Sequence, residues 1–330
     1  MVNEIDSTYM QRCLWLARQG RLLSRPNPMV GAVIVSHDGR ILGEGYHARC
    51  GEGHAEVNAF GSVSSADQHL LADSTIYVSL EPCSHQGRTP PCADLIVNRG
   101  VRRCVVGTQD PFARVQGRGI ARMRAAGIDV TVGVMEAECR WLNRRFFTFH
   151  SEGRPYVILK WAQSADGYMD DHGHAATFST PATLQLMHRL RQREDAIVVG
   201  HTTWQREHPR LDSRLWGKSA RADGLPMPQR FVLSHTTDFL PTGYLVATSI
   251  DNLMAQCRER ELQSLIVEGG RQTLQAFICS GMYDELRIET AQHKTGGGTP
   301  APTLPQAVKQ VSQTVCDGNS ICRYIRIKDI

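Results

Sequence analysis

The sequence predicts an α/β protein with two domains. Predicted strands alternate with predicted helices in both halves of the chain, a pattern typical of layered α/β domains. The chain has 330 residues, which exceeds the usual size of a single hydrophobic core. We place the domain boundary near residues 149–154, which gives a first domain at 1–150 and a second at 151–330.

The first half opens with a helix predicted at residues 6–20, where apolar side chains recur every three or four positions. Strands at 29–35 and 41–46 follow, and Asp38-Gly39 between them is a typical hairpin turn. The later elements are a helix from residue 54, a strand at 74–80, a helix at 93–99, a strand at 103–107, a helix ending at 126, a strand at 129–134 and a connecting helix at 136–149.

The second half also alternates. Strands are predicted at 156–160, 196–200, 231–234 and 265–268, and helices at 181–193 and 253–260. The last strand turns into a helix at Gly269-Gly270, where the backbone can approach a ligand and the helix start can bind phosphate. Such a turn is ordinary, and by itself it more often holds no ligand.

The formal net charge of the whole chain is +4. This mild excess predicts neither a surface that binds nucleic acid nor a membrane tether, but it suits a phosphorylated small-molecule substrate. No stretch approaches the ~20 apolar residues of a membrane-spanning helix, and the N-terminus lacks the pattern of a secretory signal. The ten cysteines are scattered, which is typical of reduced thiols. We therefore expect a cytoplasmic protein with no nucleic-acid or membrane partner. We also expect a homo-oligomer, although the sequence does not itself give the oligomeric state.

One histidine and two cysteines form a candidate zinc site. His54 begins a His-Ala-Glu sequence, and Cys83 and Cys92 belong to the segment 81–92. One imidazole and two thiolates leave the fourth tetrahedral position of zinc open for a water molecule, which is the catalytic arrangement. Glu56 would lie beside the metal and move protons to and from that water, as zinc deaminases require. The alternative is that these residues are core cysteines or a structural clip.

The two cysteines lie nine positions apart (92 minus 83), whereas zinc deaminases commonly have Cys-x-x-Cys. The insert between them carries a His, an Arg and a Thr, which can hold an anionic ligand near the metal. The segment 81–92 reads Glu-Pro-Cys-Ser-His-Gln-Gly-Arg-Thr-Pro-Pro-Cys, and together with His54-Ala55-Glu56 it resembles the deaminase family of riboflavin biosynthesis. The resemblance implies a zinc-dependent, cytidine-deaminase-like domain of three layers.

The same resemblance implies four substrate-binding residues in the first domain, namely Asn27, His47, His85 and Arg88. From residue type alone, an Asn between two prolines more often shapes a turn, and a lone His is more often structural. In the family pattern Asp-Pro-Asn-Pro-x-Val-x-Gly-x-Gly, Phe112-Ala113 here replaces Asn-Pro, so that the contacts of this loop are expected to differ. Gly117 and Gly119 match the pattern, but a Gly-x-Gly sequence is weak evidence for phosphate binding.

The second half resembles the reductase domain that is fused to this deaminase in bifunctional riboflavin enzymes. The residues that carry the resemblance include Ser164-Ala165-Asp166-Gly167, Arg191, Thr203, Pro209, Leu211, Arg214 and Glu268-Gly269-Gly270. The resemblance implies a fold like that of dihydrofolate reductase, with NADPH as the hydride donor. It implies substrate contacts for Arg191, Leu211, Arg214 and Glu268, and cofactor contacts for Gln163, Thr177, Thr203, Glu207 and Gly270. Arginine suits a ribose phosphate, because a guanidinium binds phosphate through two hydrogen bonds.

The sequence departs from the reductase pattern in several places, including a loose match at residues 296–300. Residues 175–179 read Ala-Ala-Thr-Phe-Ser, where the family often has Ser-x-Trp-Ile-Ser/Thr, so that one hydroxyl and the Trp are lost. Glu207 stands where the family has Asp, which makes the carboxylate one methylene longer. A reduced or altered reductase activity is therefore one hypothesis for this chain.

Together, these patterns predict a bifunctional enzyme of riboflavin biosynthesis. The first domain would deaminate 2,5-diamino-6-ribosylamino-4(3H)-pyrimidinone 5′-phosphate by hydrolysis, and the second would reduce the ribosyl group to ribityl with NADPH. Three alternatives stay open: a deaminase with a degenerate reductase domain, a zinc deaminase of another nucleobase, and a non-enzymatic zinc-stabilised module that binds a nucleotide. The insert at 84–91 argues against a nucleic-acid substrate, and Glu56 argues against a purely structural zinc site.

Overall fold

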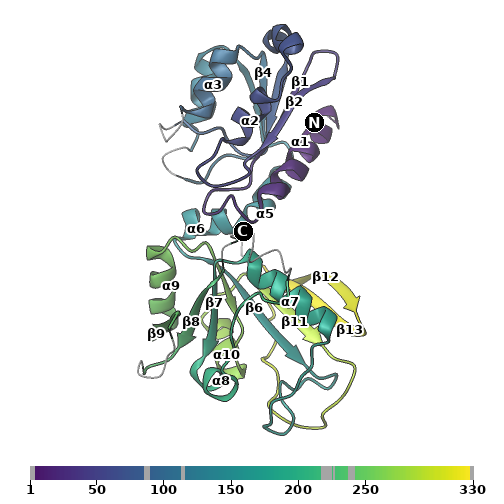
Figure 1. Ribbon diagram of the computed structural model, residues 1–330, viewed down its shortest axis with the longest axis vertical. Helices are drawn as coiled ribbons and strands as arrows, with labels where there is room; N and C mark the ends of the chain where they lie inside the picture. Colours follow the sequence, from purple (N-terminus) through teal and green to yellow (C-terminus); the bar gives the residue numbers. More distant parts are fainter. Residues whose placement is uncertain are drawn as a thin grey trace. The chain divides into compact units, whose positions relative to one another are not determined.

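The computed structural model describes residues 4–84, 90–112, 116–216, 225, 227–236 and 242–327. The chain forms two compact units, Met1–Glu152 and Gly153–Ile330 (Figure 1). Each unit contains one sheet with helices packed against it, so the predicted α/β class is confirmed. Within the described ranges, no helix has both the length and the apolar composition needed to cross a membrane.

The first unit is built on a five-stranded sheet with the strand order β2-β1-β3-β4-β5. Its strands are β1 (Gly31–Val35), β2 (Ile41–Tyr46), β3 (Thr75–Val78), β4 (Arg103–Val106) and β5 (Asp129–Val132). β1 runs antiparallel to β2 and β3, whereas β3, β4 and β5 are parallel. The loops after β3 and β4 therefore leave the same edge of the sheet, and they are joined by a hydrogen bond from Glu81 N to Thr108 O.

Helices cover both faces of this sheet and make three layers (Figure 1). One face packs against α2 (Ala55–Gly61), α3 (Cys92–Arg99) and α4 (Arg118–Ala125), and the other against α1 (Glu4–Ala17) and α5 (Glu136–Leu142). Alternate residues of a strand serve the two cores, since Ile76 and Val78 face the first group of helices and Tyr77 faces the second. Burial on both faces explains why β1 is apolar at every position. The 3₁₀ helices η1 (Arg18–Gly20) and η2 (Ser65–Asp73) also belong to this unit.

The single helix predicted at 136–149 is wrong, because two helices occupy this stretch. α5 ends at Leu142 and α6 (Arg144–Glu152) begins after Asn143. The Asn143 side chain donates from Nδ2 to Met29 O and accepts at Oδ1 from Met29 N, both over 2.8 Å. These bonds fix the break between the helices. Phe146 and Phe147 of α6 pack against Leu80, so the segment is part of the first unit's core rather than a linker only.

The second unit is built on an eight-stranded sheet with the order β12-β13-β11-β6-β10-β7-β8-β9. Its strands are β6 (Tyr156–Gln163), β7 (Ala196–Gly200), β8 (Gln229–Leu233), β9 (Tyr244–Ala247), β10 (Ser264–Val267), β11 (Glu285–Thr290), β12 (Val308–Cys316) and β13 (Asn319–Arg326). The strands from β11 to β9 are parallel, and the hairpin of β12 and β13 joins β11 in antiparallel fashion. α7 (Pro181–Arg193) and α8 (His201–Glu207) pack on one face, and α9 (Ile250–Glu259) and α10 (Arg271–Cys279) on the other.

The predicted elements of this unit agree with the structure up to α10, except that α8 and β9 are not predicted. β7 and α7 have the predicted bounds. β11, β12 and β13 are also missing from the prediction. The reason is plain for β12, whose central positions are exposed and rich in polar side chains, so that its sequence has no buried face.

We expect the substitution Asn143→Ala to lower the free energy of unfolding of the first unit by about 1–3 kcal/mol. The substitution removes a buried amide side chain, and the main-chain N–H and C=O groups of Met29 then lose their hydrogen-bond partner. Hydrogen exchange of the peptides that contain α5 and β1 measures this effect. Glu138→Ala, at an exposed position of α5, is the matched control and should change the free energy by less than about 0.5 kcal/mol. Equal protection in the two variants would contradict the role given to Asn143.

Candidate functional site

Three donor atoms converge at the start of two helices in the first unit. His54 immediately precedes α2, Cys83 lies in the loop after β3, and Cys92 is the first residue of α3. The Nδ1 atom of His54 lies 3.6 Å from the Sγ atom of Cys83 and 3.4 Å from that of Cys92. The three donor atoms all lie within 4.8 Å of one another, so the structure brings the three predicted zinc ligands together.

The spacing of these donors fits a zinc ion. Bonds of about 2.0 Å to nitrogen and about 2.3 Å to sulfur at a tetrahedral angle place N and S about 3.5 Å apart. The charges fit as well, because the first thiolate of a neighbouring pair disfavours ionisation of the second thiol unless a cation lies between them. Cys92, and then His54, lower the pKa of the Cys83 thiol to about 4, while Cys83 raises the pKa of Cys92.

Helix α3 supports the thiolate of Cys83. The main-chain N–H of Cys92, the first residue of this helix, donates to Cys83 Sγ over 3.3 Å. A helix N-terminus carries a partial positive charge and favours the ionised form of a nearby cysteine. The turn from Pro91 into α3 therefore positions one candidate ligand, Cys92, and stabilises the negative charge of the other, Cys83.

Glu56 lies in the first turn of α2 and is buried, with 3 % of its surface exposed. Its carboxyl group interacts with His54 and with both cysteines. Burial, and then the negative charge of Cys83, raise the pKa of Glu56 to about 7. A carboxyl group with such a pKa exchanges a proton readily near neutral pH.

Asn27 and His47 lie next to the donor cluster. Asn27 Nδ2 is 3.1 Å from His47 Nε2, and His47 Nδ1 is 3.1 Å from the carbonyl oxygen of Gly53. Both contacts are hydrogen bonds when His47 is neutral with its proton on Nδ1, and burial lowers the pKa of this histidine. The His47 ring meets the His54 ring edge-on, with 5.3 Å between the centroids. His85 and Arg88, the other two predicted substrate residues, lie outside the described residues.

In the second unit, the predicted substrate residues Arg191 and Glu268 form a partly buried ion pair. Arg191 donates from Nε and from its terminal NH2 group to the two carboxylate oxygens of Glu268, over 3.0 and 2.6 Å. Arg191 lies on α7 and Glu268 directly follows β10. Burial disfavours the charge of Glu268, but Arg191 outweighs it and the pKa of the carboxyl group is lowered.

The predicted cofactor residues fall into two groups. Thr203 of α8 and Gly270 before α10 meet, since Gly270 N donates to Thr203 Oγ1 over 3.0 Å. The other three are placed separately. Gln163 ends β6 and accepts from Trp161 Nε1, and Thr177 and Glu207 are exposed.

Comparisons with known proteins match both units of the chain. Residues 3–108 match the family described as the cytidine and deoxycytidylate deaminase zinc-binding region, and residues 155–324 match the RibD C-terminal domain. The riboflavin biosynthesis protein RibD of Aquifex aeolicus is 34 % identical over 90 % of this chain and 90 % of its own length, and that of Escherichia coli is 34 % identical over 88 % and 89 %. The chain belongs to the RibD family.

Solved RibD structures share the fold of the whole chain. One form of Acinetobacter baumannii RibD superposes with a TM-score of 0.88 at 28 % identity, covering 98 % of this chain and 99 % of its own. A protein from Thermotoga maritima, described as a diaminohydroxyphosphoribosylaminopyrimidine deaminase/5-amino-6-(5-phosphoribosylamino)uracil reductase, superposes with a TM-score of 0.84 at 29 % identity and covers 98 % and 99 %. The chain is thus a bifunctional riboflavin biosynthesis enzyme with a deaminase unit and a reductase unit, which confirms the predicted class of enzyme.

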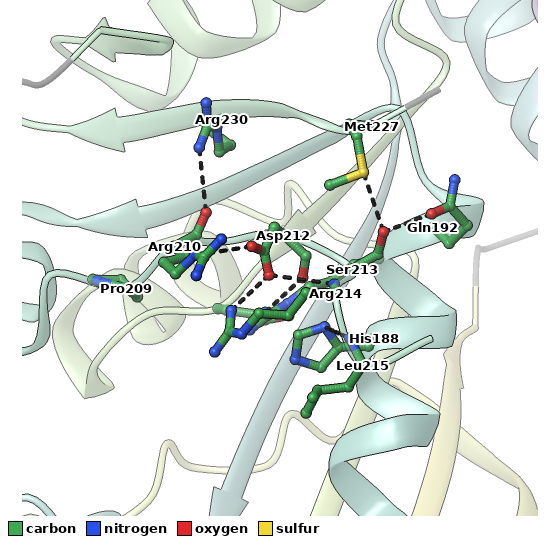
Figure 2. A network of polar contacts seen from close by, with 12 residues as sticks. His188, Gln192, Pro209, Arg210, Asp212, Ser213, Arg214, Leu215, Met227 and Arg230 are labelled. Atoms are coloured by element: carbon green, nitrogen blue, oxygen red, sulfur yellow. Dashed lines mark hydrogen bonds and ion pairs between the residues drawn. The ribbon is translucent and has the colours of Figure 1, made fainter. Parts of the chain in front are cut away.

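Within the RibD reductase unit, Asp212 organises two arginines (Figure 2). Its carboxylate accepts from Arg214 over 2.6 Å and pairs with Arg210 Nε at 3.1 Å. The Asp212 side chain is only 9 % exposed, whereas that of Arg214 is 39 % exposed. Leu211, directly before Asp212, is buried and has a positive φ of 50°. Arg214, a predicted substrate residue, is therefore already held by an internal carboxylate.

Two residues near the predicted sites were not among the candidates. Asp212 is one, and the alternating charges of Arg210, Asp212 and Arg214 are the sequence signal that could have identified it. Lys160 is the other. Its Nζ atom lies 3.9 Å from Glu289 Oε2. Burial lowers the pKa of Lys160, although the negative charges of Glu268 and Glu289 act in the opposite direction. The sequence signal that could have identified Lys160 is that it is the single charged residue in the apolar first part of β6.

His188 should make the stability of the reductase unit depend on pH. It is 3 % exposed, and burial, followed by the charges of Arg191 and Arg214, lowers its pKa to about 4. The unfolded chain, with a pKa near 6.5 for this residue, binds the proton more readily. The contribution of neutral His188 is therefore complete above about pH 6.5 and is lost as the pH falls from about 6.5 towards 4.

Denaturant unfolding of His188→Gln between pH 7.5 and 4 measures this contribution, and we expect a smaller slope of stability against pH than in the wild type. His174→Gln, at an exposed position of the same unit, is the control and should keep the wild-type slope. A wild-type slope in the His188 variant would show that another group is responsible.

Proposed function

We propose that the deaminase unit hydrolytically removes the 2-amino group of 2,5-diamino-6-ribosylamino-4(3H)-pyrimidinone 5′-phosphate, and that the reductase unit then reduces the ribosyl group to ribityl with NADPH. The observation that carries the proposal is the cluster of His54, Cys83 and Cys92 with the buried Glu56 beside it. The name of the Thermotoga maritima relative describes the same pair of activities. All ten cysteines are free, which supports a cytoplasmic location as part of this proposal.

In the deaminase unit, we assign His54, Cys83 and Cys92 as zinc ligands. Zinc with three protein ligands supplies an activated water at neutral pH when it is bound. Glu56 takes the proton from the attacking water and gives it to the leaving amino group, because its buried carboxyl group interacts directly with the three candidate ligands.

Asn27 and His47 are assigned to hold the pyrimidine. The bond of His47 Nδ1 to Gly53 fixes the orientation of its ring. Asn27 uses Nδ2 on His47, so its Oδ1 is the atom we assign to the substrate's amino group. His85 and Arg88 remain predicted contacts of the substrate, and the positive charge of Arg88 suits the phosphate.

In the reductase unit, we assign Arg191, Leu211, Arg214 and Glu268 to the phosphorylated substrate, and Gln163, Thr177, Thr203, Glu207 and Gly270 to NADPH. NADPH supplies the hydride. The bond between Gly270 and Thr203 holds the main chain at the N-terminus of α10, where helix amides favour a phosphate group. The ion pair with Glu268 fixes the orientation of Arg191, which presents a pre-arranged side chain to the substrate.

A deaminase with weakened reductase activity is the second candidate, and the pairing of Arg214 with Asp212 favours it. An internal carboxylate competes with a substrate phosphate for the same guanidinium. The losses at residues 175–179 and the longer Glu207 act in the same direction. A homo-oligomeric state remains a prediction.

A two-step assay tests the proposal. Zinc-loaded wild-type protein supplied with the diamino substrate should release ammonia first and oxidise NADPH afterwards. Glu56→Gln should release ammonia at less than about a thousandth of the wild-type rate, since the proton carrier is lost, while it binds zinc normally and still oxidises NADPH when the deaminated compound is supplied. No ammonia from the wild type would contradict the proposed substrate, and normal turnover in the variant would contradict the role of Glu56.

We expect Asp212→Asn to lower the KM of the reductase step for the phosphorylated substrate by about 5–20-fold, because a neutral amide no longer competes for Arg214. NADPH oxidation with the deaminated compound measures KM. Asp251→Asn, at an exposed position of α9, removes the same charge elsewhere and is the control. A higher KM in Asp212→Asn would show that Asp212 positions Arg214 for the phosphate instead.

A further inference from the structure

Glu81, the residue two positions before the zinc ligand Cys83, is a buried carboxylate with a dense set of main-chain partners. It is 4 % exposed. Its Oε1 atom accepts from Gly119 N over 3.0 Å and from Ile120 N over 3.3 Å. Its Oε2 atom accepts from Gly117 N over 3.0 Å and from Asp110 N over 3.2 Å. Four main-chain N–H groups, from a segment about 30 to 40 positions further along the chain, thus donate hydrogen bonds to the side chain of Glu81.

These donors include the first N–H groups of α4, which have no partner within their helix. Gly117, the residue before α4, offers no side chain as a cap and has a φ of 74°, a conformation that favours glycine. Glu81 supplies the cap from another part of the sheet, and its negative charge suits the positive end of the helix. The Gly-x-Gly sequence at 117–119 therefore binds an internal carboxylate, which explains it without a phosphate ligand.

A second contact joins the same two segments. A Cβ atom added at Gly119 would collide with the carbonyl oxygen of Pro82, so the glycine is what allows α4 to approach this turn. Pro82 directly precedes Cys83. Glu81 and Pro82 are thus both fixed by the start of α4, one through charge-assisted hydrogen bonds and the other through close packing.

We propose that Glu81 is a positioning residue of the deaminase centre, which fixes the Cys83 thiolate for the metal by binding the start of α4. The proposal rests on the function proposed above for Cys83. Cys83 lies in a loop after β3 and has no helix or strand of its own to hold it. The bonds of Glu81 to α4 and of Cys92 N to Cys83 Sγ fix this loop from both sides.

Zinc affinity, measured by competition with a chromophoric chelator, tests the proposal with a readout that is independent of turnover. Glu81→Gln keeps the shape of the side chain but places an NH2 group against main-chain donors. We expect its zinc affinity to fall about 10–100-fold, as for other residues that orient metal ligands. We also expect the absorption bands of the cobalt(II)-substituted variant to shift, because the Cys83–metal geometry changes.

Asp6→Asn is the matched control. Asp6 is also a buried carboxylate of the deaminase unit, 3 % exposed, but it pairs with Arg103 and Tyr77 instead of the loop that carries Cys83. This variant should lose thermal stability and yet keep the zinc affinity and the cobalt spectrum of the wild type. Glu81→Asp, which keeps the charge but reaches one methylene less far, should give an intermediate loss and replaces Glu81→Gln if that variant does not fold.

The positioning role alone would be overturned if the wild type binds zinc and the Glu81 variants have the same zinc affinity and the same cobalt spectrum as the wild type. An equal loss of affinity in Asp6→Asn would overturn it too, because the effect would then follow from general destabilisation. A wild type that binds neither zinc nor cobalt(II) at His54, Cys83 and Cys92 would overturn the proposed function together with this inference.

Discussion

The meeting of two thiol groups with one imidazole is the constraint on which the deaminase unit depends. Cys83 and Cys92 come from different sides of a loop, and His54 comes from the start of another helix. Two ionised sulfur atoms at this distance repel each other, so the site is complete only with a cation. The helix start at Cys92 offsets part of this repulsion through one N–H group, and the cap that Glu81 provides for α4 holds the loop in place.

Both units use the carboxyl edge of parallel strands for their candidate sites. Cys83 follows β3 and Glu268 follows β10. Each residue therefore lies at the carboxyl edge of its sheet, where the loops of neighbouring parallel strands meet. Parallel strands give every following loop the same exit edge, which is why open α/β sheets bind ligands there. The antiparallel hairpin of β12 and β13 lies beyond β11 at one end of the sheet and extends it without adding such a loop.

Local chemistry was readable from the sequence, and long-range pairing was not. The Asp38-Gly39 hairpin and strand β7 follow from turn chemistry and from an uninterrupted apolar run, both of which are local signals. The break between α5 and α6 depends on hydrogen bonds to Met29, which lies more than a hundred positions away. The hydrophobic periodicity of residues 136–149 therefore gives no sign of this break. The three candidate zinc ligands could be named from the sequence because an ordered motif contains them, whereas Asp212 acts through a charge pairing that only the fold creates.

The two candidate sites differ in how their charge is balanced. In the reductase unit, Arg191 and Arg214 each have a carboxylate of the same chain as partner, so their side chains are oriented before any ligand arrives. A phosphate must then share or displace these partners, and its affinity depends on the difference between two strong interactions. In the deaminase unit, the described contacts of the two thiols include His54 but no arginine or lysine, and we assign the balancing charge to the metal. We therefore expect the reductase activity to be most sensitive to substitutions of charged side chains. The deaminase activity should be most sensitive to substitutions of the residues that hold the sulfur atoms at metal-binding distance.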